Sequence, residues 1–190
     1  ALCLLALFVL LQFNLYTIIL ALCSMPLAFS YPYMKRFTYW PQLFLGITFN
    51  YGLILGWTTI YADVSFAPLI FYCGAIFWTL GYDTIYGYQD IKDDEIIGVK
   101  STSIKFKKSP KLFILICYSI FFMSLIYIGF EMNFSNIYFF VLILIALHLF
   151  FFQISQLKIN SKKNCLEVFK SNNFLGFLVF VNLLIGKVII

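Results

Sequence analysis

The sequence predicts an all-α, polytopic transmembrane helical bundle, and three observations support this fold class. Of the 190 residues, 63% are hydrophobic, 21% are aromatic and only 11% are charged, and the mean hydropathy is +0.95. Apolar runs close to the roughly 20 residues that cross a bilayer recur along the whole chain. The basic residues are concentrated between those runs. This composition lies far outside the range of soluble domains.

Six apolar runs are long enough to be full spans, and a seventh is shorter. The short run, 1–13, cannot cross a bilayer alone and begins without Met, a basic n-region or a cleavage signature. We interpret it as the end of a truncated helix. The six full spans are expected at 15–33, 41–61, 66–86, 112–130, 137–156 and 174–190.

The connections between the spans alternate in charge. Residues 35–36, 92–111 and 158–170 hold twelve of the thirteen Lys and Arg residues, and only Lys187 lies elsewhere. Because positive connections stay on the cytoplasmic side, these three are expected to be cytoplasmic. The net charge of +5 is explained by this bias, so nucleic-acid binding is not indicated.

Polar residues inside the spans are expected to serve packing. Gln42, Thr48 and Asn50 fit helix-to-helix hydrogen bonds better than ligand contacts. His148 has no second histidine or carboxylate at helical spacing, so a hydrogen-bonded packing role is expected. Asn172 and Asn173 come at the start of the last expected span, where Asn is a good helix cap.

The stretch 82–102 is the most informative part of the chain. It holds five of the eight acidic residues, where the apolar run 66–86 meets a basic connection. If one helix continued through it at about 100° per residue, Asp83, Asp90 and Asp94 would share a sector of roughly 60° with Gly87. Asp83 lies about one turn inside the apolar run, and an ionisable group at that depth indicates function rather than a solvated face.

Carboxylates crowded in this way repel one another unless a cation neutralises them. A hard divalent cation is the natural ligand, and Mg²⁺ is the usual choice where phosphates also bind. At about 1.5 Å per residue, Asp90 and Asp94 would be about 6 Å apart and Asp83 about 10 Å from Asp90. The outer pair can therefore share one ion, whereas Asp83 serves a second ion or the reacting substrate.

A second informative stretch, 31–42, places a basic pair at the membrane surface. Pro32 and Pro41 bracket a short connection that holds Lys35 and Arg36. A basic pair is also ordinary at a cytoplasmic helix end, but Arg36 is the sole arginine of the chain, and arginine offers a bidentate fork for carboxylate or phosphate. Lys100 either reaches a phosphate oxygen or only adds to the cytoplasmic charge bias.

The spacing D-x-x-x-G-x-x-D-x-x-x-D, met by Asp83, Gly87, Asp90 and Asp94, resembles the second aspartate-rich motif of the UbiA family of intramembrane prenyltransferases. The fuller string YDTIYGYQD..DD..IG.KST is similar to the 4-hydroxybenzoate polyprenyltransferases within that family, and the segments 31–42 and 171–177 agree with it. The chain departs from the family in one respect, since the first aspartate-rich motif, expected before the first helix, is absent.

The resemblance implies a ring of helices around a central chamber, formed here by a single transmembrane prenyltransferase domain, 1–190, truncated at its N-terminus. It implies transfer of a polyprenyl group from polyprenyl diphosphate to the ring of 4-hydroxybenzoate, with Mg²⁺ assisting departure of the diphosphate. Asp83, Asp90 and Asp94 would be the catalytic and metal-binding residues. Lys35 would meet the diphosphate and Arg36 the aromatic carboxylate, although these two roles could be exchanged.

The resemblance also implies a multi-pass protein of a bacterial or mitochondrial inner membrane. Alternative acceptors are a naphthoate, a homogentisate or a haem. A transporter or membrane scaffold is a further alternative, but the acids cluster at one end of one span and do not thread the bilayer. Because the first motif is absent, the chain alone is expected to be inactive.

Overall fold

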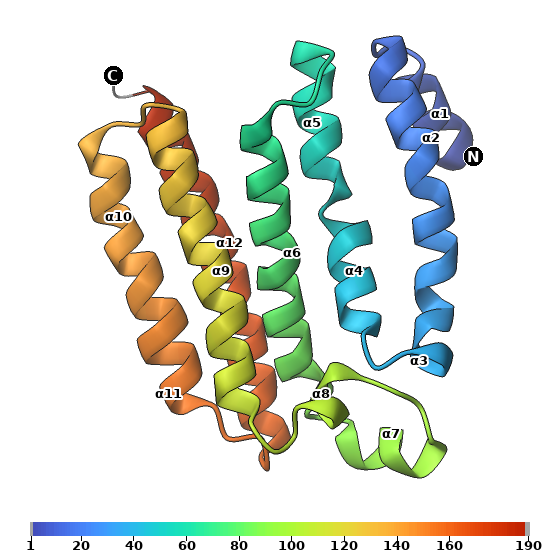
Figure 1. Ribbon diagram of the computed structural model, residues 1–190, viewed down its shortest axis with the longest axis vertical. Helices are drawn as coiled ribbons and strands as arrows, with labels where there is room; N and C mark the ends of the chain where they lie inside the picture. Colours follow the sequence, from blue (N-terminus) through green and yellow to red (C-terminus); the bar gives the residue numbers. More distant parts are fainter. Residues whose placement is uncertain (1, 189–190) are drawn as a thin grey trace.

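The computed structural model describes residues 2–188, and within them the chain is helical with short connections (Figure 1). The N-terminal half contains α1 (Leu2–Leu10), α2 (Leu15–Ser30), the 3₁₀ turn η1 (Tyr31–Tyr33), α3 (Met34–Phe37), α4 (Pro41–Phe49), α5 (Tyr51–Tyr61) and α6 (Phe66–Gly87). The C-terminal half contains α7 (Ile91–Ile97), α8 (Thr102–Lys105), α9 (Pro110–Glu131), α10 (Asn136–Ala146), the π-helical segment η2 (Leu147–Gln153), α11 (Ile154–Gln156) and α12 (Lys162–Val188). The all-α fold class is confirmed.

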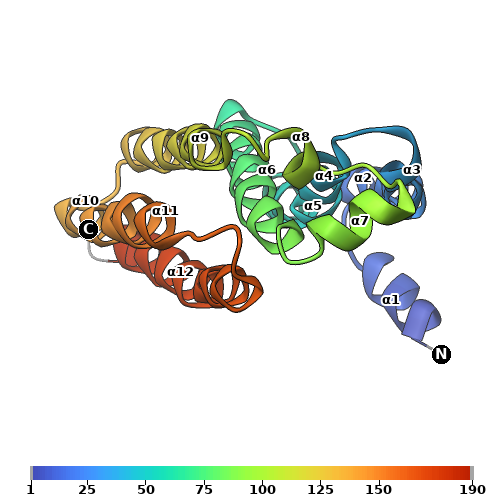
Figure 2. The ribbon, with the colours of Figure 1, turned by 90° about the horizontal axis from the view of Figure 1, so that it is seen from below.

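Five helical segments among the described residues are long and apolar enough to cross a membrane. They are Leu15–Phe37, Pro41–Tyr61, Pro110–Glu131, Asn136–Gln156 and Lys162–Lys187. The one remaining expected span, 66–86, forms the 22-residue helix α6 but is not among these five. Its length is sufficient, whereas its tyrosines, its glycines and Asp83 dilute its apolar character. This composition suits a helix that is covered by α4, α9 and α12 (Figure 2).

The prediction for the last span was wrong at its start. The helix α12 begins at Lys162 rather than at residue 174, so most of the expected loop 158–170 is helical. A hydropathy argument finds only the apolar part of a helix, while Lys, Glu and Leu are good helix formers that extend it beyond the bilayer. Asn172 and Asn173 therefore lie within α12 and are not caps. Residues 189–190 of the predicted span lie outside the described residues.

The span 41–61 is divided at Asn50. Its backbone, at φ −84° and ψ 0°, ends α4 and precedes α5. The Asn50 Nδ2 amide donates to the Gly46 carbonyl at 2.8 Å and, across to α6, to Thr79 Oγ1 at 2.7 Å. The predicted helix-to-helix role of Asn50 is confirmed, and the same bonds hold the break in place.

The helices stand in a curved row with α1 at one end and α10 at the other (Figures 1 and 2). The pair α6 and α9 forms the centre of the core, where Leu80, Tyr118 and Phe121 are at most 1% exposed. Apolar side chains such as Met123 and Phe140 point outward and are more than half exposed, which fits a lipid-facing surface. The three basic connections all lie at the same end of the helices, along the lower edge of the molecule in Figure 1.

Candidate active site

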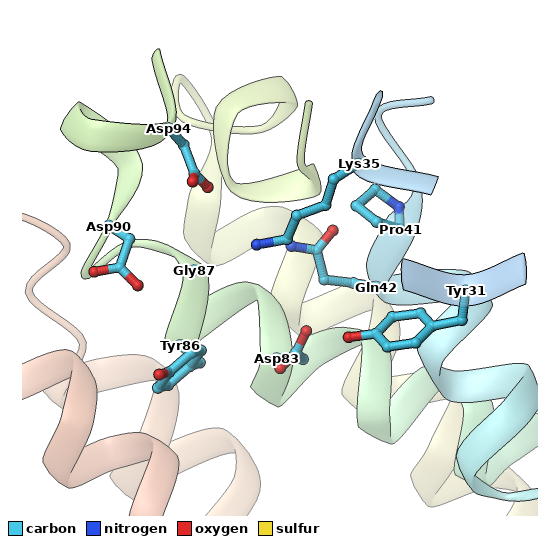
Figure 3. Close-up of a pocket in the computed structure, with 9 residues that line it drawn as sticks. All are labelled: Tyr31, Lys35, Pro41, Gln42, Asp83, Tyr86, Gly87, Asp90 and Asp94. Atoms are coloured by element: carbon cyan, nitrogen blue, oxygen red, sulfur yellow. The ribbon is translucent and has the colours of Figure 1, made fainter. Parts of the chain in front are cut away.

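A polar pocket of about 100 Å³ lies at that same end, where α6 meets the connection between α2 and α4 (Figure 3). Its walls come from two parts of the chain that are far apart in sequence: the η1–α4 region, and the end of α6 with the start of α7. The lining residues are Tyr31, Lys35, Pro41, Gln42, Asp83, Tyr86, Gly87, Asp90 and Asp94. The three predicted carboxylates therefore share one pocket.

The geometry by which the carboxylates meet differs from the prediction. A single helix through the motif was expected, but α6 ends at Gly87, a turn follows, and Asp90 stands at the N-cap position of the separate helix α7. The Asp94 backbone N–H donates to the Asp90 carbonyl at 2.8 Å in the first turn of α7. A turn, and not helical periodicity, thus brings Asp90 and Asp94 over Asp83.

The five acids of the stretch divide into two groups. Asp93 pairs with Lys162 at 3.4 Å and Glu95 pairs with Lys107, both on the outer surface. Asp83, Asp90 and Asp94 line the pocket, with Asp83 and Asp94 partly buried. The outward pairs leave the pocket carboxylates as the ones available to a ligand.

Of the three predicted basic site residues, the pocket includes Lys35 but neither Arg36 nor Lys100. The Lys35 side chain extends into the pocket (Figure 3). Lys100 serves the pocket indirectly, because its backbone N–H donates to the Lys35 carbonyl at 2.8 Å and its Nζ donates to the Phe37 carbonyl at 3.2 Å. It thereby braces the segment that carries Lys35.

Three pocket residues with polar side chains were not predicted as site residues: Tyr31, Gln42 and Tyr86. The Tyr31 ring points toward Asp83 (Figure 3). Gln42 is 4% exposed, and its Oε1 accepts the Thr102 backbone N–H at 3.0 Å. The available signal for Gln42 was an amide at the start of an apolar run.

Gly87 lets the segment after α7 pack against the end of α6. A Cβ atom at this position would lie 2.2 Å from Ser103 Oγ, which is too close for any other residue to be accommodated without movement. Ser103 Oγ donates to the Thr84 carbonyl at 2.9 Å, and Thr84 and Thr102 share a hydroxyl–hydroxyl bond of 2.6 Å. These buried bonds fasten the far end of the acidic stretch.

A second, larger cavity adjoins the polar pocket. It has a volume of about 510 Å³ and is bordered by α4, α6 and α12; we call it the chamber. Its lining residues are Leu45, Phe49, Asn50, Trp78, Thr79, Tyr82, Asp83, Phe169, Asn172, Asn173, Gly176 and Phe177. Asp83 lines both cavities. The site therefore combines a charged head region with a mostly aromatic and apolar body, joined at one carboxylate.

The donor set of the polar pocket suits Mg²⁺ in one particular way. Within residues 2–188 no three His, Cys, Asp or Glu side chains are grouped closely enough to hold a metal by themselves. Mg²⁺ is commonly held by one or two carboxylates together with substrate phosphates. Asp90 and Asp94, as hard oxygen ligands at one rim, match that mode.

These features define a class: a polytopic membrane protein with an acidic, lysine-containing pocket next to a mostly apolar chamber. Residues 1–183 match the model of the UbiA prenyltransferase family. The chain belongs to this family, as its motifs predicted.

Curated relatives agree with this assignment. The chain is 41% identical to the mitochondrial 4-hydroxybenzoate polyprenyltransferase of Bos taurus, covering 96% of this chain and 49% of the relative. It is 41% identical to the Arabidopsis thaliana protein of the same name, with coverages of 97% and 45%, and 39% identical to 4-hydroxybenzoate geranyltransferase 2 of Lithospermum erythrorhizon, with coverages of 94% and 58%. The chain thus spans about half the length of these relatives.

A solved structure shares the fold. The apo structure of a UbiA homolog from Aeropyrum pernix K1 superposes with a TM-score of 0.75 at 20% identity, covering 93% of this chain and 66% of that one. The helical arrangement described above is therefore that of the family.

Proposed function

We propose that this chain supplies a diphosphate-binding pocket to a transferase that moves a polyprenyl group from polyprenyl diphosphate to a ring carbon of 4-hydroxybenzoate. The observation that carries the proposal is the position of Asp83, which lines both the charged pocket and the chamber. A prenyl diphosphate has the same two parts, an anionic head and an apolar tail. Asp83 would lie where the two parts of the substrate join.

The polar pocket supplies the groups that hold a diphosphate. Lys35 offers an ammonium that binds phosphate oxygens directly. Asp90 and Asp94 would hold Mg²⁺, which when bound neutralises the head group and stabilises the departing diphosphate. Without a cation, three carboxylates would repel the diphosphate, so the pocket requires one for binding.

The chamber and Asp83 would serve the carbon chemistry. When the bond between the prenyl carbon and the diphosphate oxygen breaks, its electron pair leaves with the diphosphate, and the chamber keeps water from the allylic cation. The ring carbon ortho to the phenol then bonds to the prenyl carbon and loses its proton. Asp83 would assist deprotonation of the phenol or stabilise the cation.

The names of the relatives support the proposed acceptor and the proposed membrane. Of the three named above, two are mitochondrial 4-hydroxybenzoate polyprenyltransferases and one is a 4-hydroxybenzoate geranyltransferase. This supports 4-hydroxybenzoate over a naphthoate, homogentisate or haem acceptor, and a mitochondrial over a bacterial membrane. The positive-inside rule places the acidic pocket on the cytoplasmic or equivalent side.

A prenylation assay in membranes tests the proposal. The chain is assayed as it stands and joined to the N-terminal portion of a curated relative, because it spans about half their length. Prenylated 4-hydroxybenzoate and released diphosphate are measured with Mg²⁺ and with chelator, alongside a naphthoate and homogentisate. With the joined chain we expect Mg²⁺-dependent product from 4-hydroxybenzoate, and with the chain alone we expect none; transfer to another acceptor in its place would contradict the proposed substrate.

Asp94→Asn and Asp93→Asn form a matched pair of neighbours for the site itself. Asp94 lines the pocket, while Asp93 pairs outward with Lys162. We expect Asp94→Asn to lower turnover at saturating Mg²⁺ by at least about a hundredfold, the scale of losing a group that stabilises transition-state charge. Asp93→Asn should stay within about threefold of the parent, as for exposed pairs. Equal effects of the two substitutions would refute the assignment of the pocket.

A further inference from the structure

Behind the wall of the chamber lies a buried polar network that the transfer chemistry described above does not use. Gln153, in the π-helical segment η2, is 0% exposed. Its Nε2 amide donates to Asn172 Oδ1 on α12 at 3.0 Å, and its Oε1 accepts from Asn172 Nδ2 at 3.3 Å. The two amides therefore form a closed, reciprocal pair between η2 and α12.

Each remaining bonding position of the pair is also filled. The Tyr118 hydroxyl on α9 donates to Gln153 Oε1 at 2.5 Å, and the second Gln153 N–H lies 3.3 Å from His148 Nδ1. Asn172 Nδ2 also donates to the Phe169 carbonyl at 3.1 Å. A fully satisfied network in apolar surroundings is rigid, because any displaced member leaves a costly unpaired group.

The network ends at the chamber. The Trp78 indole N–H on α6 donates to Asn172 Oδ1 at 2.9 Å, and both residues line the chamber that contains Asp83. Gln153 and Tyr118 are not among the lining residues of that cavity. The orientation of Asn172 in the chamber wall is thus determined by the Gln153 amide, which a ligand in the chamber does not contact.

Trp78 is held on its other sides as well. Its ring stacks on Phe121 at 5.0 Å with an interplanar angle of 7° and meets Tyr82 edge to face at 5.6 Å. A Cβ at Gly176 would lie 3.2 Å from the Trp78 ring, so the absent side chain makes room for the indole. These contacts hold the indole in one position, on the same helix α6 that carries Asp83.

We propose that Gln153 is a positioning residue for prenyl transfer: through Asn172 it fixes the Trp78 indole in the chamber wall, so that the ring fills space that water would otherwise occupy beside the allylic cation. The π-helical segment supports this role, since such segments are frequent at functional sites. The inference rests on the proposed function. It concerns the fate of the cation, which bonds either to the acceptor ring carbon, with loss of a ring proton, or to water, giving prenyl alcohol and a proton.

The test measures the ratio of prenylated acceptor to prenyl alcohol formed in the membrane assay. For Gln153→Leu we expect the ratio to fall by about tenfold, the change that one buried hydrogen bond can supply. Exchanging the two amides, Gln153→Asn together with Asn172→Gln, should return the ratio to within about threefold of the parent, because a reciprocal pair is again possible. Gly176→Leu should also lower the ratio, because it displaces the indole while leaving the Gln153–Asn172 amide pair in place.

Tyr138→Phe is the matched control for a merely structural effect. Tyr138 is also fully buried, and its hydroxyl donates to the Leu125 carbonyl at 2.8 Å, away from the chamber. It should lower thermal stability to a similar extent as Gln153→Leu but leave the ratio unchanged. An unchanged ratio in an active Gln153→Leu variant, or an equal fall in Tyr138→Phe, would overturn the inference while leaving the proposed function intact.

A second measurement is independent of activity. The ¹⁵N-labelled indole resonance of Trp78, assigned with Trp78→Phe, should shift in Gln153→Leu and return in the exchanged pair. Absence of a shift would overturn the inference by itself. If the parent makes no prenylated acceptor, the proposed function fails, and the partition claim fails with it.

Discussion

At the scale of single residues, the composition of the chain and the structure of the pocket favour different basic residues as the ligand contact. The sole arginine of the chain, Arg36, attracted the prediction of a bidentate ligand contact, yet the pocket is lined by its neighbour Lys35. Both lie in the one-turn helix α3, where successive side chains diverge by about 100°. One of two adjacent residues can face the pocket, and composition alone does not indicate which.

Lys35→Gln and Arg36→Gln test this choice. Losing the ammonium removes a charge-assisted bond to the diphosphate, so Lys35→Gln should raise the KM for prenyl diphosphate by about tenfold or more. Arg36→Gln should change the KM values for prenyl diphosphate and for the aromatic acid by less than about threefold, in the range of exposed charges. A larger effect of Arg36→Gln on the aromatic acid would restore the original prediction for Arg36.

At the scale of elements, helix ends and breaks build the site. The end of α6 at Gly87 and the start of α7 after Asp90 turn the acidic stretch back over Asp83. The break between α4 and α5 lets Asn50 reach α6 and face the chamber. A continuous helix through 82–97 would have spread Asp83, Asp90 and Asp94 along one helix face, with Asp83 about 10 Å from Asp90.

The Asn50 break is expected to be stabilising. Asn50→Leu removes the bond to Thr79 and leaves the Ala75 and Gly46 carbonyls without this donor. We expect a loss of about 1 kcal/mol in the free energy of unfolding in detergent micelles, typical of interhelical hydrogen bonds in membranes. Thr48→Val is the control, because the Thr48 hydroxyl donates only within its own helix, to Phe44 at 2.8 Å. Equal losses would mean that the contact with α6 contributes nothing.

At the scale of the whole molecule, charge and structure agree on one functional end. The three basic connections, the acidic pocket and α7 lie together, whereas Lys187 is near the opposite end of α12 (Figure 1). An apolar outer surface and this charge asymmetry are the features that orient a membrane protein. The polar pocket is therefore expected at the more positive side.

Labelling of introduced cysteines with a membrane-impermeant maleimide tests the orientation. Lys92→Cys, Lys108→Cys and Lys163→Cys replace exposed lysines in two of the basic connections and should all react from the cytoplasmic or equivalent side. Lys187→Cys should react only from the opposite side. The parent chain controls for Cys3, Cys23 and Cys73, which are exposed on apolar helices and should be shielded by lipid. Reaction of all four from one side would contradict the arrangement.

Much of the fold and part of the site were predictable because they rest on local patterns. Hydrophobic run length gave the helices 15–33, 112–130 and 137–156 close to their observed bounds, and motif spacing identified Asp83, Asp90 and Asp94 as well as the family. Burial of apolar surface and the cost of ionisable groups in lipid act on each segment separately, so these features can be predicted from the sequence of each segment.

Tertiary structure alone decided the rest. Whether the motif is one helix or two, which of Lys35 and Arg36 enters the pocket, and which acids are paired outward all depend on contacts between distant segments, such as Lys100 with Lys35 and Asp93 with Lys162. The same holds for Asn172, which reads as a helix cap in sequence and is in fact a buried partner of Gln153 and Trp78. A hydrogen bond between helices forms where packing brings the donor and the acceptor together. The spacing of residues within either helix does not predict that contact.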